Sequence, residues 1–380
     1  MSVVEVGMLI LLVALVGTVA AEGAALDAAT ELNNRGAQLY LQAHYAEAEP
    51  LYRQALETWT QTGAAGRLGR ARILGNLGSL LRATGRYAEG ETLLVEALQQ
   101  VEASAGAASP DAGLALDNLA ALYRAKGDLA KAEECALRAG PLLVESERAT
   151  NRQVLASIYI EQRRFAEAES ILHAALEGAS DQVACTAYIN LTFAAIAQSR
   201  FAAADDYGRR ALELARRVLP ARHPAVAVAL NNMAQVDRFL GRYLEAEQHY
   251  REAIDRWEET LGPRHPDLAW GLMNLAEFYH VRDRETGAED LYRRGIQILG
   301  ESLGKDDPQV LFARSQLAGV LCGERRYTEA AKLGRAALAG LEKALDWDDP
   351  RVARARSIYV RVLEAARRPK EAGRDRQGFR

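Results

Sequence analysis

Aromatic residues, proline and cysteine are all scarce in this sequence. Aromatic side chains account for 7% of its 380 residues, and alanine dominates the apolar set. Because small side chains let helices approach closely, this composition favours helices packed on helices over a core built from β-sheets. Only ten prolines are present and none interrupts the main periodic stretches, so long helices are permitted.

The cysteines exclude a disulfide scaffold. Cys135, Cys185 and Cys322 are odd in number, lie far apart and show no metal-ligand spacing, so we interpret them as packing residues. The net charge of −4 excludes a general attraction for nucleic acid, which needs a basic face. The charge is uneven, because residues 349–380 are basic whereas the rest of the chain is acidic.

A long apolar run occurs at the N-terminus. Met8–Ala21 (MLILLVALVGTVAA) is shorter than the roughly 20 residues of a membrane span, and its small residues fit a signal peptide cleaved after Ala20 or Ala21. The segment before it contains Glu5 and no Lys or Arg, so an uncleaved anchor, a capping helix and a misplaced start stay open. We expect residues 1–21 to be a signal peptide or N-terminal anchor. The protein would then be exported or membrane-anchored rather than cytoplasmic.

Catalytic motifs are absent as well. The sequence contains no HExxH, P-loop, GxSxG or dinucleotide-binding glycine pattern. Acidic pairs such as Glu47/Glu49 recur at the starts of helices, where negative charge suits the helix dipole. We therefore expect no enzymatic activity, no catalytic residue, no cofactor and no metal site.

The sequence does contain a long-range repeat. An asparagine column recurs at Asn34, Asn76, Asn118, Asn190, Asn232 and Asn274 and continues at Gln316. The spacing is 42 residues, except for a gap of 72 after Asn118 that Val154 divides into two units of 36. This register predicts eight units, with a ninth starting at Ile358.

Each unit is expected to form two helices. Apolar residues recur at i, i+3, i+4 and i+7 around the asparagine. Nine residues after it, Gly85, Gly127 and Gly241 fit a left-handed helix end. A second helix follows, with two small-residue columns that begin at Ala48 and Ala55 and mark its contact with a neighbouring helix. The two shortened units should have second helices that are shorter by about a turn or more.

The joints between units are also periodic. His223 and His265 occupy the same position in adjacent units, so we interpret them as joint residues rather than as a metal or acid–base pair. Ser or Asp fills this position elsewhere, where it predicts an N-cap before a proline at the first helical position. The prolines lie eight residues before the asparagine column, at Pro110, Pro224, Pro266, Pro308 and Pro350.

Three segments resemble the kinesin-light-chain type of tetratricopeptide repeat: LNNMA (230–234), GRYLEAEQHYREAI (241–254) and LGPRHPDLA (261–269). The resemblance covers roughly residues 27–366, but the long N-terminal coiled coil of motor light chains is missing. It implies an all-α, right-handed superhelical solenoid of antiparallel helix pairs, with eight units plus a C-terminal capping helix. We expect the array at 26–348, the capping helix at 349–368 and a basic disordered tail at 369–380.

The resemblance also implies where a peptide binds. In this family the first helices line a concave groove, and the second Asn of the NN pair faces it; here that position is the asparagine column. Asn disfavours helix interiors, so six of them in register need a compensating role. A side-chain amide can hold a passing peptide backbone. A purely structural bond between neighbouring helices is the alternative.

Basic and apolar side chains are expected to flank this column. Those six residues beyond it are Arg82, Arg124, Arg238 and His280, and those on similarly inward-facing positions are Phe193, Trp270 and Met273. The set suits an extended acidic peptide with an apolar anchor. The positions of the cochaperone carboxylate clamp hold Ala37, Ser79 and Ala121, so binding of chaperone C-termini is not expected.

The sequence thus predicts a non-catalytic, monomeric scaffold whose partner is a protein or peptide, with membrane contact only through an uncleaved leader. The alternative is a structural subunit of a cell-envelope or secretion assembly, which contacts partners through its convex face or its ends. A contact of the basic tail with anionic lipid or nucleic acid is a third, weaker reading.

Overall fold

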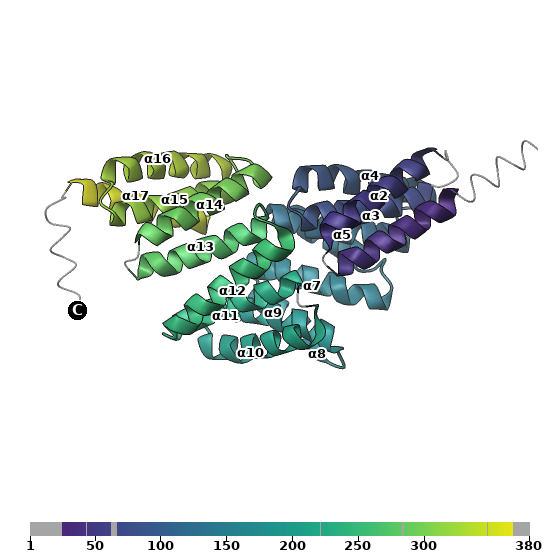
Figure 1. The fold of residues 1–380 in the computed structure, drawn as a ribbon, viewed down its shortest axis with the longest axis horizontal. Helices are drawn as coiled ribbons and strands as arrows, with labels where there is room; N and C mark the ends of the chain where they lie inside the picture. Colours follow the sequence, from purple (N-terminus) through teal and green to yellow (C-terminus); the bar gives the residue numbers. More distant parts are fainter. Residues whose placement is uncertain are drawn as a thin grey trace, which may run out of the picture. The chain divides into compact units, whose positions relative to one another are not determined.

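The structure is a computed structural model that describes residues 25–42, 44–61, 67–220, 222–282, 285–347 and 349–367 (Figure 1). Every regular element in these ranges is a helix, and none of them contains a strand. None of the described helices is long and apolar enough to cross a membrane. The expected leader, residues 1–21, and the expected basic tail, residues 369–380, lie outside the described residues.

The chain divides into two compact units, residues 1–190 and 191–380. The first unit begins with a helix at 25–41, and α9 (Asp181–Ala197) contains the division. The other helices of the first unit are α2 (Tyr45–Gln61), α3 (Arg67–Ala83), α4 (Tyr87–Ala105), α5 (Pro110–Lys126), α6 (Leu129–Ala139), α7 (Glu145–Glu161) and α8 (Phe165–Leu176).

The second unit continues the alternation of first and second helices. Its last helix, α17 (Pro350–Arg367), packs against α15 and α16. The other helices of this unit are α10 (Phe201–Val218), α11 (Pro224–Phe239), α12 (Tyr243–Leu261), α13 (Pro266–Val281), α14 (Glu285–Leu303), α15 (Pro308–Gly323) and α16 (Tyr327–Ala344). The odd-numbered helices from α3 to α17 carry the asparagine register, and the even-numbered ones are the second helices.

The small-residue columns form close contacts between helices. Ala48, Ala132, Ala168, Ala204, Ala246, Ala288 and Ala330 are all completely buried. At Gly295, in the other column, an added Cβ would lie 2.9 Å from Cγ of Met273 and 3.2 Å from the carbonyl oxygen of Ala269. The two helices of a pair therefore touch almost backbone to backbone, as the columns predict.

The second helices of the shortened units are indeed short. Helices α6 and α8 have 11 and 12 residues, whereas α4, α12 and α14 each have 19. This prediction is confirmed. One detail was not foreseen: Pro50 lies inside α2, and the helix continues through it.

The turns between paired helices use the left-handed conformation. Gly85, Gly127 and Gly241 have φ of 75°, 80° and 77°, as predicted. Arg163, Ser199 and Arg325 occupy the same slot with φ of 63°, 58° and 63°. A side chain in this conformation costs about 1–2 kcal/mol relative to the right-handed form, a cost that glycine avoids.

All five joint prolines begin their helices, and the residue before each of the first four is an N-cap. Nδ1 of His223 accepts a hydrogen bond from the backbone N–H of Ala225 at 3.2 Å, and Nδ1 of His265 accepts one from Asp267 at 3.0 Å. Only an unprotonated Nδ1 can accept such a bond. The two histidines are joint residues, as the sequence predicts.

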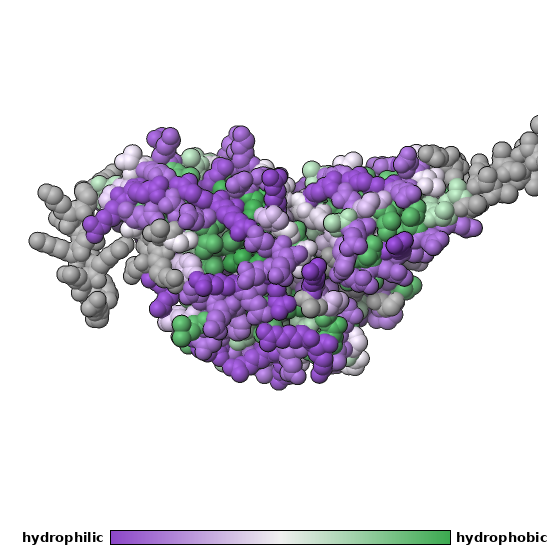
Figure 2. All heavy atoms as spheres, in the orientation of Figure 1, coloured by the Kyte–Doolittle hydropathy of each residue, from purple (hydrophilic) through white to green (hydrophobic). Residues whose placement is uncertain are grey.

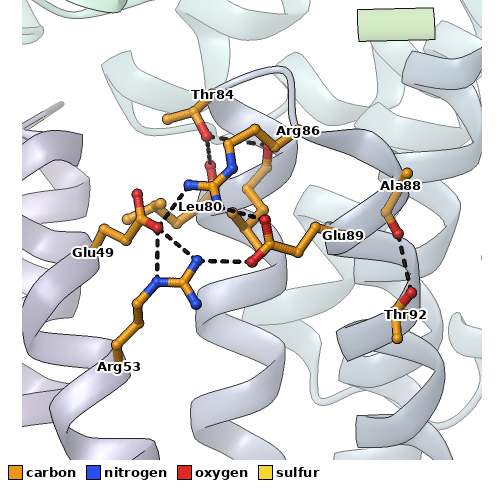
Figure 3. A network of polar contacts seen from close by, with 9 residues as sticks. Glu49, Arg53, Leu80, Thr84, Arg86, Ala88, Glu89 and Thr92 are labelled. Atoms are coloured by element: carbon orange, nitrogen blue, oxygen red, sulfur yellow. Dashed lines mark hydrogen bonds and ion pairs between the residues drawn. The ribbon is translucent and has the colours of Figure 1, made fainter. Parts of the chain in front are cut away.

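Four charged side chains tie α2 to α4 (Figure 3). Nη1 of Arg86 lies 2.7 Å from Oε1 of Glu49, and Nη2 of Arg53 lies 2.7 Å from Oε1 of Glu89. Arg53 also binds Glu49, and Arg86 binds Glu89, which closes a ring. The Arg53 guanidinium, opposed by partial burial and assisted by Arg86, lowers the pKa of the Glu89 carboxyl.

The same ring recurs between α14 and α16 of the second unit. Its members are Glu289, Arg293, Arg326 and Glu329, with ion pairs of 2.5 to 2.9 Å. The sequence pattern places these acids at helix starts but does not reveal their pairing across repeats. Because exposed pairs contribute only about 0.2–1 kcal/mol each, the rings orient successive second helices more than they stabilise them.

The capping role of His223 predicts that stability depends on pH. Burial lowers the pKa of His223, so the unfolded chain takes up the proton more readily than the folded one. The free energy of unfolding should therefore fall as pH drops through about 6.5 and below, by up to about 1 kcal/mol from this cap. Thermal melts of the protein and of His223→Asn, an N-cap that does not titrate, should diverge below that pH. Parallel pH profiles would contradict this account of the cap.

Candidate functional site

One face of α13 carries a row of partly exposed side chains. Trp270, Asn274, Glu277 and Val281 follow the i, i+4, i+7, i+11 spacing of a single helix face. The exposed fraction is 38% for Trp270 and 66% for Val281. We call these four residues the α13 stripe. Figure 2 shows a mostly hydrophilic surface with separate hydrophobic patches, one of them in the region where Figure 1 draws α13 and α14.

A charged bridge crosses this face. Oε1 of Glu277 lies 2.9 Å from Nη2 of Arg354 on α17 and 3.8 Å from Nη1 of Arg238 on α11. Glu277 and Arg354 are two repeats apart, so their side chains meet over α15. The bridge therefore lies on the face of α13 that carries the stripe, because Glu277 belongs to both.

Two tyrosines lie beneath the bridge. Tyr250 and Tyr292 come from the second helices α12 and α14 and are almost completely buried. Burial raises the pKa of both phenols well above its usual range, and the charges of Arg238 and Glu277 act on both. The floor of this face is therefore polar, although water does not reach it.

The asparagine column makes bonds from one repeat to the next. Nδ2 of Asn76 donates to Oδ1 of Asn33 at 2.9 Å, and Nδ2 of Asn274 donates to Oδ1 of Asn231 at 3.1 Å. The second Asn of one repeat thus donates to the first Asn of the repeat before it. The structural role that the sequence left open is present at these two positions, and each bond uses one of the two amide hydrogens.

The asparagine column varies in the first compact unit, residues 1–190. Gly75 replaces the first Asn, and the Asn118 amide packs near its backbone instead, 3.6 Å from where a Cβ would stand. In the shortened repeat, Asn151 takes over, because its Nδ2 donates to Asp117 at 2.8 Å and to the carbonyl oxygen of Ala136 at 3.1 Å. Asn151 lies one turn before Val154, so the 42-residue register could not reveal it.

The predicted basic residues differ in their partners. Arg82 of the first unit donates to the hydroxyl of Tyr40 at 3.4 Å, and Arg124 pairs with Glu161 at 2.7 Å. In the second unit, the guanidinium of Arg238 lies 4.4 Å above the ring of Phe239 besides facing Glu277. His280 is half-buried and lines a cavity shared with α15 and α17.

The predicted apolar residues differ in their exposure to solvent. Phe193 and Trp270 are 40% and 38% exposed, which leaves an aromatic surface on α9 and on α13. Met273 does not join them: it is 7% exposed and packs against Gly295 of α14. Its position in the interior of the α13–α14 pair corrects the expectation that it lines the groove.

The remaining predicted residues fall on the first helices of both units. Asn34 is exposed, and Asn118 and Asn190 are half-buried; Asn190 belongs to the first unit. Asn232 is 6% exposed, which, as for Met273, corrects the expectation that it lines the groove. The second unit therefore combines Arg238, Trp270, Asn274 and His280 on neighbouring first helices, together with Glu277 and Arg354. The last two could not be predicted from the sequence because their contact joins residues 77 positions apart.

A buried acid–histidine pair lies in the α11–α12 hairpin. Oδ2 of Asp237 lies 2.8 Å from Nδ1 of His249, and Oδ1 lies 2.9 Å from Nε of Arg242. Asp237 is 2% exposed and Arg242 also reaches Asp205. Two partners satisfy this carboxylate, which is the arrangement that a buried structural charge requires.

Comparison with known proteins identifies the family of these repeats. The family model described as "Tetratricopeptide repeat" matches residues 27–89, 69–139, 182–259, 225–301 and 267–343, which is more than half of the chain. The unmatched stretch from 140 to 181 contains much of the two shortened units. No curated protein matches the sequence.

One solved structure supports the helical fold, and two others show a weaker likeness. A Rap protein complexed with competence and sporulation factor is 14% identical, with a TM-score of 0.56, over 89% of this chain and 98% of that one. A putative kinesin light chain from Podospora anserina is 19% identical, with a TM-score of 0.42, over 49% and 89%. A signal transduction ATPase with a tetratricopeptide repeat sensor from Pyrococcus horikoshii is 16% identical, with a TM-score of 0.49; the match covers 84% of this chain but only 53% of that longer protein.

The bond between Asn274 and Asn231 predicts a cost for its removal. Asn274→Ala should lower the free energy of unfolding by about 1 kcal/mol, because Asn231, which is 7% exposed, loses its donor. The better helix propensity of Ala offsets part of this cost. Asn118→Ala is the matched control, because Asn118 faces Gly75, and it should be neutral or slightly stabilising. Equal denaturation midpoints for the two variants would show that the inter-repeat bond contributes nothing.

Proposed function

Because the chain belongs to the tetratricopeptide repeat family, we propose that it is a non-catalytic scaffold that binds an extended acidic peptide or protein segment. The binding surface is the face of the first helices in the second unit. The observation that carries this proposal is the bridge from Arg238 and Arg354 to Glu277. Folds of this family are protein-binding scaffolds, and a Rap protein has been solved in complex with competence and sporulation factor.

The charges of the bridge favour an acidic ligand. Two guanidinium groups face one carboxylate, so the bridge carries an excess positive charge. The Arg354 side chain is 54% exposed and can turn toward a carboxylate of the ligand, whereas Arg238 is 18% exposed and is held more firmly. A hydrogen bond to a charged group contributes about 1.5–3 kcal/mol, so these two arginines supply a substantial part of the affinity.

Aromatic side chains supply the apolar contact. Trp270 lies on the α13 stripe one turn before Asn274, and more than a third of its surface is open. Aromatic residues in such positions are frequent anchors of binding energy. An apolar ligand side chain packed on Trp270 would place the ligand backbone beside Asn274, whose amide keeps one hydrogen for it.

The free energies of the individual contacts indicate a moderate affinity for the peptide. Micromolar binding requires about −8 kcal/mol, and each neutral hydrogen bond adds only about 0.5–1.5 kcal/mol. Asn76 and Asn274 each donate one amide hydrogen to the neighbouring repeat, so only the other hydrogen is left for a ligand. The asparagines would therefore align the peptide more than they would add to its affinity. Charge and aromatic contact then provide most of the binding free energy.

A second candidate function has its own observation. The edge formed by the α11–α12 turn and the end of α13 exposes Phe239, Leu240, Tyr243, Leu244 and Val281, with Leu244 at 77%. Exposed apolar patches often mark protein contacts. A structural subunit that docks through this edge would keep its partner when the groove is altered, and it would lose the partner when Leu244 and Val281 become polar.

The bridge predicts opposite effects of two substitutions on an acidic ligand. The probe is a fluorescein-labelled peptide with a central Trp flanked by Asp and Glu. Arg354→Gln should weaken its binding about ten-fold, which is about 1.4 kcal/mol. Glu277→Gln should strengthen binding, because it releases both arginines from their internal carboxylate. Fluorescence anisotropy titrations measure both effects.

Controls separate charge at this site from charge in general. Arg356 lies on the same helix as Arg354 but pairs with Glu342 at 2.8 Å, so Arg356→Gln should leave probe affinity unchanged. Added salt should reduce the difference between the protein and Arg354→Gln, since screening acts on charge. If Glu277→Gln weakens binding as much as Arg354→Gln does, the bridge is a structural element and the proposed groove is wrong.

A further inference from the structure

A cavity of about 250 Å³ lies among the ends of α13, α15 and α17 in the second unit. The residues that shape it are His280, Gly319, Arg325, Tyr327, Ile358 and Arg361. Its volume equals that of roughly eight water molecules, enough for one ligand side chain. No residue of this cavity except His280 belongs to the predicted site.

The cavity exists because one side chain is missing from a column. Three residues after the asparagine register, successive first helices carry Gln235, Glu277, Gly319 and Arg361. At Gly319 an added Cβ would lie 3.6 Å from Cγ2 of Ile358 and 4.0 Å from Nε2 of His280, which are ordinary contacts. The backbone therefore does not require glycine there, and the absent side chain leaves open space.

The cations at this cavity lack the acidic partners that three other arginines of α17 have. Arg351, Arg354 and Arg356 pair with Asp349, Glu277 and Glu342, respectively. Arg361, by contrast, forms no ion pair with any residue in the described part of the chain, although Glu364 follows it on the same helix.

Arg325 adds a second cation at a conformational cost. It occupies the left-handed turn slot at φ 63°, where Gly85, Gly127 and Gly241 stand in other repeats. Its counterpart Arg163 uses its side chain locally, with the guanidinium 5.5 Å from the ring centre of Phe165. The Arg325 side chain instead lines the cavity and has no ion pair among the described residues. Strained residues that persist in this way point to function.

From these observations we propose that the cavity binds an acidic side chain of the partner segment. Its carboxylate would lie between Arg325 and Arg361, and its apolar stem would lie against Ile358. This proposal rests on the proposed peptide groove and specifies one anchor of its ligand. The residues differ from those of the cochaperone carboxylate clamp, whose positions here hold Ala37, Ser79 and Ala121.

The direct test uses trifluorobutyrate, a small carboxylate with an apolar stem, and fluorine NMR of the full chain. The protein should broaden its signal and should not broaden that of the neutral trifluorobutyramide. Gly319→Leu, which fills the cavity, and Arg361→Gln should each weaken binding about ten-fold. Gly319→Ala and Arg356→Gln are the matched controls and should bind as the unaltered protein does.

Arg325→Gly separates binding from stability. It should weaken trifluorobutyrate binding, yet it should raise the melting temperature, because glycine adopts the left-handed conformation without strain. A loss of both binding and stability would mean that Arg325 is structural, and it would overturn its assigned role. Unchanged binding in both Gly319→Leu and Arg361→Gln would overturn the whole proposal.

The outcomes also distinguish this cavity from the groove. If the fluorescein peptide binds but trifluorobutyrate is not broadened, the cavity proposal is wrong and the groove stands. If trifluorobutyrate is broadened but no acidic peptide binds, the carboxylate site is supported and the groove is contradicted. Displacement of trifluorobutyrate by much lower concentrations of inorganic phosphate would identify a phosphate site, contrary to the proposal.

Discussion

The close approach of paired helices at small side chains is the constraint on which the rest of this structure depends. The alanines of the first column are completely buried, and at Gly295 even a single methyl group would collide with Met273. Contacts this tight set the distance between a first helix and its second helix, and each pair then packs on the next in the same register. Every polar feature, from the asparagine bonds to the charged rings, has its spacing set by this packing.

The proposed binding surface follows from an asymmetry between the two helix types. Second helices carry the charged rings, in which every arginine has carboxylate partners from its own repeat and from a neighbouring one. On the first helices of the second unit, Arg238 and Arg354 share the single carboxylate of Glu277, and Arg361 has no ion pair among the described residues. The difference leaves positive charge beside exposed aromatic side chains, which is the combination that an acidic segment with an apolar residue would recognise.

Features that depend on local backbone chemistry could be predicted from the sequence. The left-handed glycines, the proline joints, the buried alanine columns and the short helices α6 and α8 all follow from spacing and residue type. Features that depend on the distance between non-adjacent helices could not be predicted. Arg354 reaches Glu277 across an entire repeat, Met273 turns inward against Gly295, and Asn151 replaces an asparagine of the register from one turn away. Periodicity shows which residues share a helix face, but the distance between helices that are not adjacent in the chain decides which of those residues meet.

The central claim is that the face of the first helices in the second unit binds an acidic segment. Photo-cross-linking tests it most directly: an acidic peptide with a benzophenone beside its central tryptophan is irradiated with the full chain, and the attached residues are identified by mass spectrometry. The account predicts attachment on α11, α13 and α17, concentrated around Trp270 and Arg354. Attachment confined to the second helices α12, α14 and α16, or to the Leu244 edge, would contradict it.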